Sequence, residues 1–445
     1  MLRILRDAAN DEQTRAECLS LSVTAALAGG DQYLARYFAK ILAAEVPASP
    51  WTFPSCFRVA STAYAAGSYD AALELYRASV ASADAGSAAP VQDIELALLR
   101  TAELLLYHER DASSAQAYFR RVVPANVPPT ETPLLRAMRV RLVWGTLTPR
   151  DLGLPDGNVS ALLVDQDDLW VGTWNGGVAR YSVSARHSDS FPTPSSVRAL
   201  GLAGHRVWVG GADGLSWYGK ETATWGTVEA FKSPQPVQVQ SIGFSGAVLY
   251  IGTLGSGLSR RTTDPPQGWT AVSDGSLPGS FVTCVEASRR ESSLYIGTLS
   301  QGLVIMDQES GRMKTLASVI PQFSALNVTS VHEDALGKIW VATYGDGLFL
   351  WQPAQGTLER FTRSGGQLGD DYVMAICETD RAFYFGSFGG GVSTLSKQTG
   401  KWGRLGIRDG LASRDVSAIA WRAPYVFFGT LGAGVSVYNE EADGP

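Results

Sequence analysis

Residues 169–173 read Leu169-Trp170-Val171-Gly172-Thr173, and six similar segments follow in the chain. Each places two large apolar residues, the first of them aromatic, before Gly-Thr or a close variant of it. The six are Trp208-Val209-Gly210-Gly211, Tyr250-Ile251-Gly252-Thr253, Tyr295-Ile296-Gly297-Thr298, Trp340-Val341-Ala342-Thr343, Tyr384-Phe385-Gly386-Ser387 and Phe427-Phe428-Gly429-Thr430. From Gly172 onward the equivalent positions lie 38, 42, 45, 45, 44 and 43 residues apart. A period of about 40 to 45 residues is typical of a four-stranded propeller blade.

Each copy divides further into four strand signals. In the fifth copy, residues 328–331 alternate as an inner strand, and the strand signals 338–343, 347–351 and 357–361 follow. A second glycine lies where the second strand turns into the third, where a positive φ is expected. These glycines are Gly177, Gly257, Gly302, Gly347, Gly391 and Gly434. The sequence therefore predicts a seven-bladed β-propeller over residues 143–438.

The last copy has only three strand signals before the acidic tail 439–445. Val143-Trp144-Gly145-Thr146-Leu147 matches Lys401-Trp402-Gly403-Arg404-Leu405, the outer strand of the sixth copy. Residues 143–147 are therefore predicted to supply the fourth strand of the final blade. This pairing would close the ring and leave no open sheet edge.

The segments Gly153-Leu154-Pro155-Asp156, Asn158 to Leu162 and Leu169 to Thr173 are together similar to the two-component-regulator propeller repeat. His332-Glu333-Asp334 to Thr343 resembles the same repeat, and the likeness extends over all seven copies. In that family the propellers are commonly extracytoplasmic sensor halves of signalling proteins that often recognise saccharides. The resemblance implies a sensor fold of this type.

Residues 1–142 have another composition, rich in Ala, Leu and Arg at helical spacing, with most of the 47 glycines lying further on. Gly67, Tyr69, Ala72 and Tyr76 resemble a tetratricopeptide (TPR) unit, and Ala35 and Ala115 are the matching alanines of two weaker units. The resemblance implies three helical hairpins, with a loop enlarged near 83–89 and a last helix near 132–142. Stacked hairpins of this kind form a concave groove suited to a peptide or helix. The predicted fold class is thus multidomain, an α-helical array followed by an all-β propeller.

Charge and composition exclude several classes of protein. The net charge of −6 and the pI near 5.4 do not fit a nucleic-acid binder. No apolar run reaches the roughly 18 residues that a membrane-spanning helix needs, and residues 1–7 have no signal-peptide character. Cysteines 18, 56, 284 and 377 are spaced for neither a metal site nor a disulfide framework. These features predict a cytoplasmic protein, with an extracytoplasmic location as the alternative if an upstream signal was removed.

The sequence offers no catalytic or cofactor motif. The Gly-rich runs recur at one blade position and lack the Lys of a phosphate-binding loop. His332-Glu333 lacks the second His of a zinc helix, and the four histidines lie on unrelated elements without a nucleophile elbow. We therefore expect no enzyme, no metal and no cofactor. A propeller lyase or hydrolase whose acid and base meet only in space stays open as an alternative.

Positions whose residue type is not constrained by the blade fold carry the most information about binding. The residue after each Gly-Thr pair is often large and apolar, and the connections between blades add aromatic and acidic residues at the same end of the channel. Large apolar groups in exposed turns need a reason. The candidate binding residues are Trp174, Asn175, Phe281, Tyr344, Asp346, Tyr372, Phe388 and Asp415. The alternative is that these side chains pack on one another and plug the channel.

Two surfaces could therefore bind a partner, the helical groove and the channel face of the propeller. The function predicted first is a non-enzymatic protein-binding or scaffolding protein with a protein or peptide partner. The competing hypothesis is a sensor whose propeller binds a small molecule or glycan and whose helices relay the signal. The sequence does not identify the partner or ligand.

Overall fold

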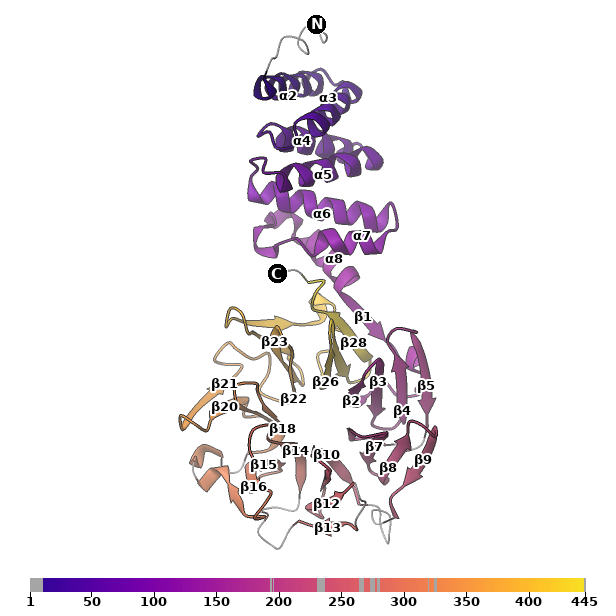
Figure 1. The fold of residues 1–445 in the computed structure, drawn as a ribbon, viewed down its shortest axis with the longest axis vertical. Coiled ribbons are helices and arrows are strands. Elements are labelled where there is room, and N and C mark those ends of the chain that lie inside the picture. Colours follow the sequence, from indigo (N-terminus) through magenta and orange to yellow (C-terminus); the bar gives the residue numbers. More distant parts are fainter. Residues whose placement is uncertain are drawn as a thin grey trace. The chain divides into compact units, whose positions relative to one another are not determined.

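The computed structural model describes residues 11–192, 194, 196–229, 237–263, 268–272, 277, 281–318, 320–323 and 326–443. The chain divides into two compact units. One consists of Met1–Val143 together with Asn439–Pro445 and is helical, and the other, Trp144–Tyr438, is a ring of β-sheets (Figure 1).

Among the residues that the structure describes, three pairs of consecutive helices and a final helix build the helical unit, as predicted. The pairs are α2 (Glu12–Ala28) with α3 (Gln32–Glu45), α4 (Thr52–Ala65) with α5 (Tyr69–Asp84), and α6 (Val91–Tyr107) with α7 (Ala112–Phe119). The 3₁₀ turns η1 (Pro124–Asn126) and η2 (Pro129–Glu131) lead to α8 (Thr132–Val143). The enlarged loop falls at 85–90, between α5 and α6.

Local sequence explains where these helices begin and how they pack. Asp11, Asp31 and Asp111 each accept a hydrogen bond from a backbone N–H in the first turn of the helix that follows, as N-cap residues do. The three matching alanines, at positions 35, 72 and 115, are all completely buried. Small side chains at these positions let neighbouring helices approach closely.

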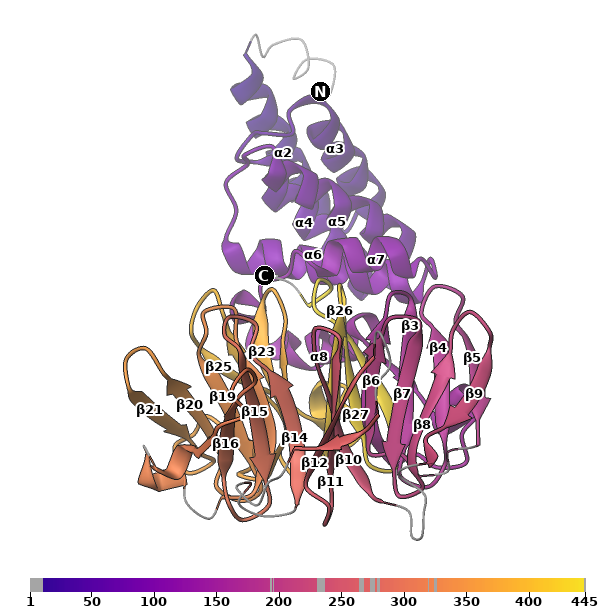
Figure 2. The same ribbon diagram turned by 60° about the horizontal axis from the view of Figure 1, so that its bottom comes forward.

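Seven four-stranded antiparallel sheets form the propeller, and they are arranged side by side around its central axis (Figures 1 and 2). Blade 1 has β2 (Val159–Asp165), β3 (Asp168–Thr173), β4 (Val178–Ser182) and β5 (His187–Phe191). Blade 2 has β6 (Ala199–Ala203), β7 (Arg206–Gly211), β8 (Gly214–Gly219) and β9 (Thr224–Thr227). Blade 3 has β10 (Val239–Ser245), β11 (Val248–Thr253), β12 (Leu258–Thr262) and β13 (Thr270–Ala271).

The remaining blades follow the same order. Blade 4 has β14 (Val282–Ala287), β15 (Ser293–Thr298), β16 (Leu303–Asp307) and β17 (Met313–Thr315), followed by the turns η4 (Leu316–Ser318) and η5 (Pro321–Phe323). Blade 5 has β18 (Val328–Glu333), β19 (Ile339–Thr343), β20 (Leu348–Gln352) and β21 (Thr357–Phe361). Blade 6 has β22 (Val373–Glu378), β23 (Ala382–Ser387), β24 (Gly391–Ser396) and β25 (Trp402–Leu405).

Blade 7 takes its outer strand from the other end of the domain. After η6 (Ile407–Asp409), it consists of β26 (Val416–Arg422), β27 (Tyr425–Thr430), β28 (Gly434–Asn439) and β1 (Trp144–Leu147), with the short helix α9 (Pro149–Leu152) after β1. Trp144 pairs with Tyr438, and Leu147 pairs with Val435. The predicted closure of the ring is confirmed, although the strand starts at Trp144 because Val143 is the last residue of α8.

The repeated Gly of the second strands is explained by the next blade. A Cβ added at Gly172 would lie 2.4 Å from Cγ1 of Val197, and one added at Gly429 would lie 2.5 Å from Cγ1 of Val159. A valine at the start of each following inner strand therefore needs a residue with little or no side chain as its neighbour. Gly429 and Val159 make the contact that joins blade 7 to blade 1.

The second glycine of each copy adopts a positive φ at all six predicted positions. At Gly347 φ is +84°, and a Cβ would lie 2.3 Å from the carbonyl oxygen of Phe361. Both the backbone conformation and the close approach therefore require glycine at this turn.

The acidic tail is not a free extension. Ala442 is completely buried, Glu440 is 6% exposed, and the Asp443 carboxylate pairs with the Arg139 guanidinium of α8. In the part of the chain that the structure describes, no helix is both long and apolar enough to cross a membrane.

Candidate functional site

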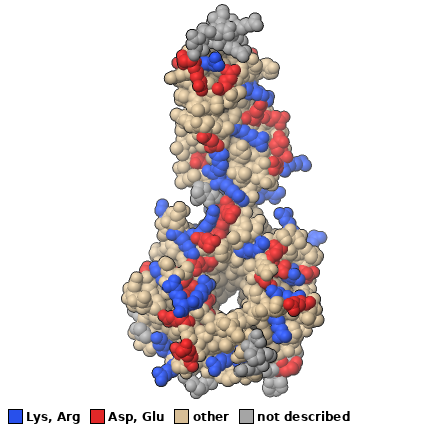
Figure 3. All heavy atoms as spheres, viewed as in Figure 1, with Lys and Arg blue, Asp and Glu red and all other residues tan. Residues whose placement is uncertain are grey.

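The turns that follow the Gly-Thr pairs share one backbone arrangement. The N–H of Tyr344 donates to the carbonyl of Asn327 at 2.9 Å, and the N–H of Phe388 donates to the carbonyl of Tyr372 at 3.0 Å. In each case the acceptor directly precedes the inner strand of the same blade. We call this side of the ring, with the turns between second and third strands and the connections into the inner strands, the turn face. Figure 3 shows an opening at the centre of the ring.

Tyr344, Tyr372 and Phe388 form an aromatic cluster on the turn face of blades 5 and 6. The rings of Tyr344 and Tyr372 meet edge to face with centroids 4.7 Å apart, and the ring of Phe388 lies 6.5 Å from that of Tyr344. Tyr344 is 47% exposed and Tyr372 is 44% exposed. A side chain that plugged the channel would be buried, so this exposure favours a surface over a plug.

A charged pair lies on the blade that carries Tyr344. Arg360 donates from Nε to the carbonyl of Asp346 at 2.8 Å, and its Nη2 lies 3.3 Å from Oδ1 of Asp346. Both side chains stay about half exposed. Together with the tyrosines they offer a ring surface, a carboxylate and a guanidinium to solvent.

The acidic connections are used mainly inside the fold. Asp415 accepts a hydrogen bond from the N–H of Gly389 at 2.7 Å, and Asp156 accepts one from the N–H of Asn175 at 3.1 Å. The Asp371 carbonyl accepts from the N–H groups of Gly345 and Gly347. Each of these aspartates ties a connection to a turn, so the predicted acidic surround of the channel is largely a set of turn caps.

Trp174 lies apart from the aromatic cluster, on blade 1. The Arg198 guanidinium stacks over its indole at 4.9 Å, while the neighbouring Asn175 is exposed. The Nη1 atom of Arg198 is buried and has no hydrogen-bond partner among the described residues, and burial lowers the pKa of this guanidinium. A buried donor without a partner destabilises the fold.

Phe281 belongs to a third place on the turn face. It is 42% exposed in the connection into blade 4 and forms an isolated bridge with Leu254 of blade 3. The structure thus brings Tyr344, Tyr372 and Phe388 together, with Asp346 in the same turn as Tyr344. Asp415 reaches the turn of Phe388 through Gly389, whereas Trp174 and Phe281 lie on other blades.

Arg198 was missed by the sequence analysis although a signal existed. Ser160, Thr283, Thr329 and Ser417 follow the first valine of their inner strands, and each donates its hydroxyl to the carbonyl of the valine in the next blade. Arg198 stands in the same register in blade 2 and cannot make this contact with a hydroxyl. An arginine at a position where four other blades have Ser or Thr is the signal in the sequence that could have identified Arg198.

His332 joins three blades at their inner strands. Its Nε2 lies 2.9 Å from Glu378 of blade 6, its Nδ1 lies 3.4 Å from Glu286 of blade 4, and Lys397 pairs with Glu378 at 2.6 Å. Burial opposes the imidazolium, but the hydrogen bonds and charges of Glu286 and Glu378 outweigh it and raise the pKa of His332. Both ring nitrogens are engaged, so the arrangement is that of an inter-blade lock.

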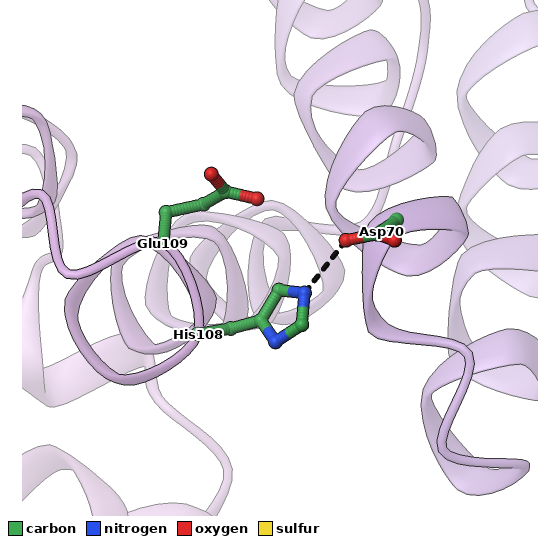
Figure 4. A group of neighbouring side chains, drawn as sticks. All are labelled: Asp70, His108 and Glu109. Carbon is green, nitrogen blue, oxygen red and sulfur yellow. Dashed lines mark hydrogen bonds and ion pairs between the residues drawn. The ribbon is translucent and has the colours of Figure 1, made fainter.

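In the described part of the helical unit, Asp70, His108 and Glu109 form a histidine–carboxylate group (Figure 4). His108 Nε2 lies 2.6 Å from Oδ1 of Asp70, and all three residues are exposed. The contact between His108 and Asp70 connects the start of α5 to the end of α6.

The family model described as the two-component regulator propeller matches residues 153–175. No curated protein matches the chain. Among solved structures, the extracellular domain assigned to the one-component system BT4673 of B. thetaiotaomicron matches at 17% identity with a TM-score of 0.55, over 66% of this chain and 40% of that one. The extracellular domain assigned to the hybrid two-component system BT3049 of B. thetaiotaomicron matches at 17% identity and a TM-score of 0.55, over 67% of this chain and 42% of that one. The chain thus spans about two fifths of these relatives.

The expected cytoplasmic location is wrong by this comparison, because the propellers that this chain resembles are extracellular domains. The expectation rested on cysteine spacing and on residues 1–7, which lie outside the described residues. A propeller can be stable without disulfides because its sheets pack on one another. The cysteine spacing therefore does not distinguish a cytoplasmic from an extracytoplasmic propeller.

The match at residues 153–175 lies on the connection and first hairpin of blade 1, where the resemblance to the repeat is strongest. The other six blades repeat the four-stranded order of blade 1. The chain is therefore a helical array followed by a seven-bladed propeller, and residues 153–175 of its first blade are similar to the two-component-regulator propeller repeat.

Proposed function

We propose that the propeller is the ligand-sensing module of an extracytoplasmic signalling protein and that it is not an enzyme. The observation that carries this proposal is the exposed pair Tyr344 and Tyr372 on the turn face, flanked by Asp346 and Arg360. Support also comes from the likeness to extracellular domains of regulatory systems. This reading, which the sequence left as the alternative, replaces the scaffold as the first hypothesis.

A saccharide suits this surface. The flat face of a sugar ring presents C–H groups to an aromatic ring, while its hydroxyls pair with a carboxylate and a guanidinium. Tyr344 and Tyr372 supply the rings, and the Asp346–Arg360 pair supplies both kinds of polar partner within the same blade. A ligand that covers two such aromatic rings removes apolar surface from water, which stabilises the complex by roughly 25 cal/mol per Å² of buried area.

The test is a saccharide screen by thermal shift, followed by calorimetry of each hit. The double variant Tyr344→Ala/Tyr372→Ala should abolish binding and leave the melting temperature of the free protein nearly unchanged, because both rings are exposed. Leu336→Ala is the matched control, since Leu336 is 72% exposed in the turn between β18 and β19, away from the turn face. Binding retained by the double variant would reject this site. A large loss of stability would instead support the plug.

Protein binding by the helical unit remains a second proposal, and a surface on α3 favours it. Tyr33 is 84% exposed and Tyr37 is 51% exposed, and with Ile41 and Ala44 they line a shallow pocket of about 470 Å³. These positions lie on one face of the helix. If a partner is identified, Tyr33→Ala/Tyr37→Ala should weaken its binding at least as much as the turn-face double variant does; the reverse order would reject this proposal.

A further inference from the structure

A groove opens between blades 2 and 3 on the side opposite the turn face. Its walls are the turn after β6, the turn after β8 and the end of β12, and its volume is about 700 Å³. Small-molecule sites commonly measure about 300 to 1,000 Å³. The main lining side chains are His205, Arg206, Trp208, Trp217, Glu221 and Arg261.

Two arginines in this groove lack a carboxylate. The Arg206 guanidinium lies 4.2 Å above the Trp217 ring, and the Arg261 guanidinium lies 5.8 Å from the Trp269 ring. Within the described residues, no carboxylate pairs with either guanidinium, whereas Arg180 of blade 1 pairs with Asp168 at 2.7 Å. Glu221 is the carboxylate among the described lining residues, and it lies 3.1 Å from His205. Among those described lining residues, two arginines therefore face one carboxylate.

The fold makes room for Trp217. A Cβ at Gly226 would lie 2.2 Å from Cζ2 of Trp217, and one at Gly219 would lie 3.3 Å from Cζ3. The other six blades have no tryptophan at this position of the third strand: their residues are Arg180, Arg260, Ile305, Leu350, Thr394 and Val437. The indole therefore packs against Gly219 and Gly226, and the Arg206 guanidinium lies over its ring.

Neighbouring gaps between blades are filled in another way. Between blades 1 and 2, the rings of Trp170, Phe191, Tyr218 and Trp225 pack with centroids 5.3 to 6.2 Å apart. Between blades 2 and 3, Trp208 belongs to the buried core, while Trp217 packs at its border beside the two arginines. The groove is the part of this gap that the core leaves open.

We propose that this groove binds a small molecule that carries a carboxylate on a six-membered ring. A guanidinium stacked on an indole keeps its N–H edge free for bidentate contact with a carboxylate. Trp217 offers apolar surface to the ring, and the hydroxyls of Thr222 and Thr224, 2.7 Å apart, lie at the same groove. A sugar acid and an aromatic acid share this chemistry.

Titration calorimetry of the full chain with D-glucuronate, benzoate and D-glucose tests the proposal. At least one acid should bind and glucose should not bind at this site; the acid that binds identifies the source of the carboxylate. Arg206→Gln and Arg261→Gln should each weaken binding of the acid roughly ten- to a hundredfold. Arg312→Gln, in the exposed turn after β16, is the matched control and should bind like the unaltered protein.

Arg206→Lys, which keeps the charge but loses the planar fork, should bind with intermediate affinity. The proposal would be overturned if neither acid gave a heat of binding. Equal affinity in the arginine variants and the control would also overturn it. The Tyr344→Ala/Tyr372→Ala variant should still bind the acid, since those residues lie on the turn face. Failure at the groove therefore leaves the proposed sensor function untouched, and failure at the turn face leaves the groove untouched.

Discussion

The helical unit and the propeller both repeat a small element, but the first is open and the second is closed. In the helical unit each hairpin packs on its neighbours along the stack, and the stack has two ends. In the propeller every blade has two neighbours, because Gly429 of blade 7 lies against Val159 of blade 1. Trp144 must meet Tyr438, almost 300 positions away, for blade 7 to have its fourth strand.

This difference decides how far a local change spreads. The matching alanines of the helical unit, at 35, 72 and 115, are unequally spaced, and the loop at 85–90 absorbs extra residues without disturbing the stack. A ring has no end at which an error can be released, so a defect at the closure acts on all blades. We therefore expect local effects in the helices and global effects in the propeller.

The largest effect is expected at the closing strand. Trp144 is 9% exposed, with its ring 4.9 Å from that of Tyr438 and 5.8 Å from that of Phe428. Trp144→Ala should cost about 3–5 kcal/mol, as core aromatic truncation does, and should unfold the propeller as one unit. Denaturation followed by tryptophan fluorescence measures it, because Trp51 is the one tryptophan of the helical unit in the sequence.

Phe38→Ala is the matched change in the helical unit, where Phe38 of α3 is 3% exposed. It should lower the free energy of unfolding of the helices, measured by far-UV circular dichroism, by a similar amount. The midpoint measured by tryptophan fluorescence should stay unchanged. If Trp144→Ala leaves that midpoint unchanged as well, β1 does not close the ring.

A smaller loss is expected at one turn of the ring. Gly347 and Gly356 both have positive φ, +84° and +64°, but only Gly347 faces a backbone carbonyl where a Cβ would lie. Gly356→Ala should cost about 1–2 kcal/mol from its conformation alone. Gly347→Ala should cost more than about 3 kcal/mol, because the contact with Phe361 adds to that strain. Equal melting temperatures for the two variants would show that the turn has been misread.

A still smaller effect, dependent on pH, is expected at His332. Its pKa is raised from 6.5 by Glu286 and Glu378 against the opposing effect of burial, so its contribution is complete below pH 6.5 and is lost as the pH rises through the raised value. Burial raises the pKa of Glu378, but Lys397 and His332 lower it below 4.5, so its contribution is present above pH 4.5. Between pH 4.5 and pH 6.5 both contributions are present, so His332→Gln should lose the most stability relative to the unaltered protein in this range. Unfolding curves whose difference does not shrink at higher pH would contradict the lock.

Sequence spacing predicted the ring, its closing strand and the positive φ of the second glycines, because these depend on contacts that repeat in every blade. The candidate site was harder to predict, because its members differ from blade to blade. Asp415 looked available, but its carboxylate is occupied by the N–H of Gly389 in the preceding blade. Arg198 drew no attention, although it stacks on Trp174. Which side chain reaches across to a neighbouring blade is set by the curvature of the ring, which a linear sequence does not contain.

The smallest effect is expected at the exposed counterpart of the His332 lock, the pair of Asp70 and His108 in the helical unit. Asp70 is 84% exposed at its side chain, so water screens the 2.6 Å contact with His108. Asp70→Asn should change the free energy of unfolding by about 0.5 kcal/mol or less, measured by chemical denaturation at pH 6. Zinc at micromolar concentration should leave the melting temperature unchanged, since Asp70, His108 and Glu109 are all open to solvent. A rise in melting temperature with zinc that is lost in Asp70→Asn would instead make this group a metal site, and local stability in the open array would then depend on an ion.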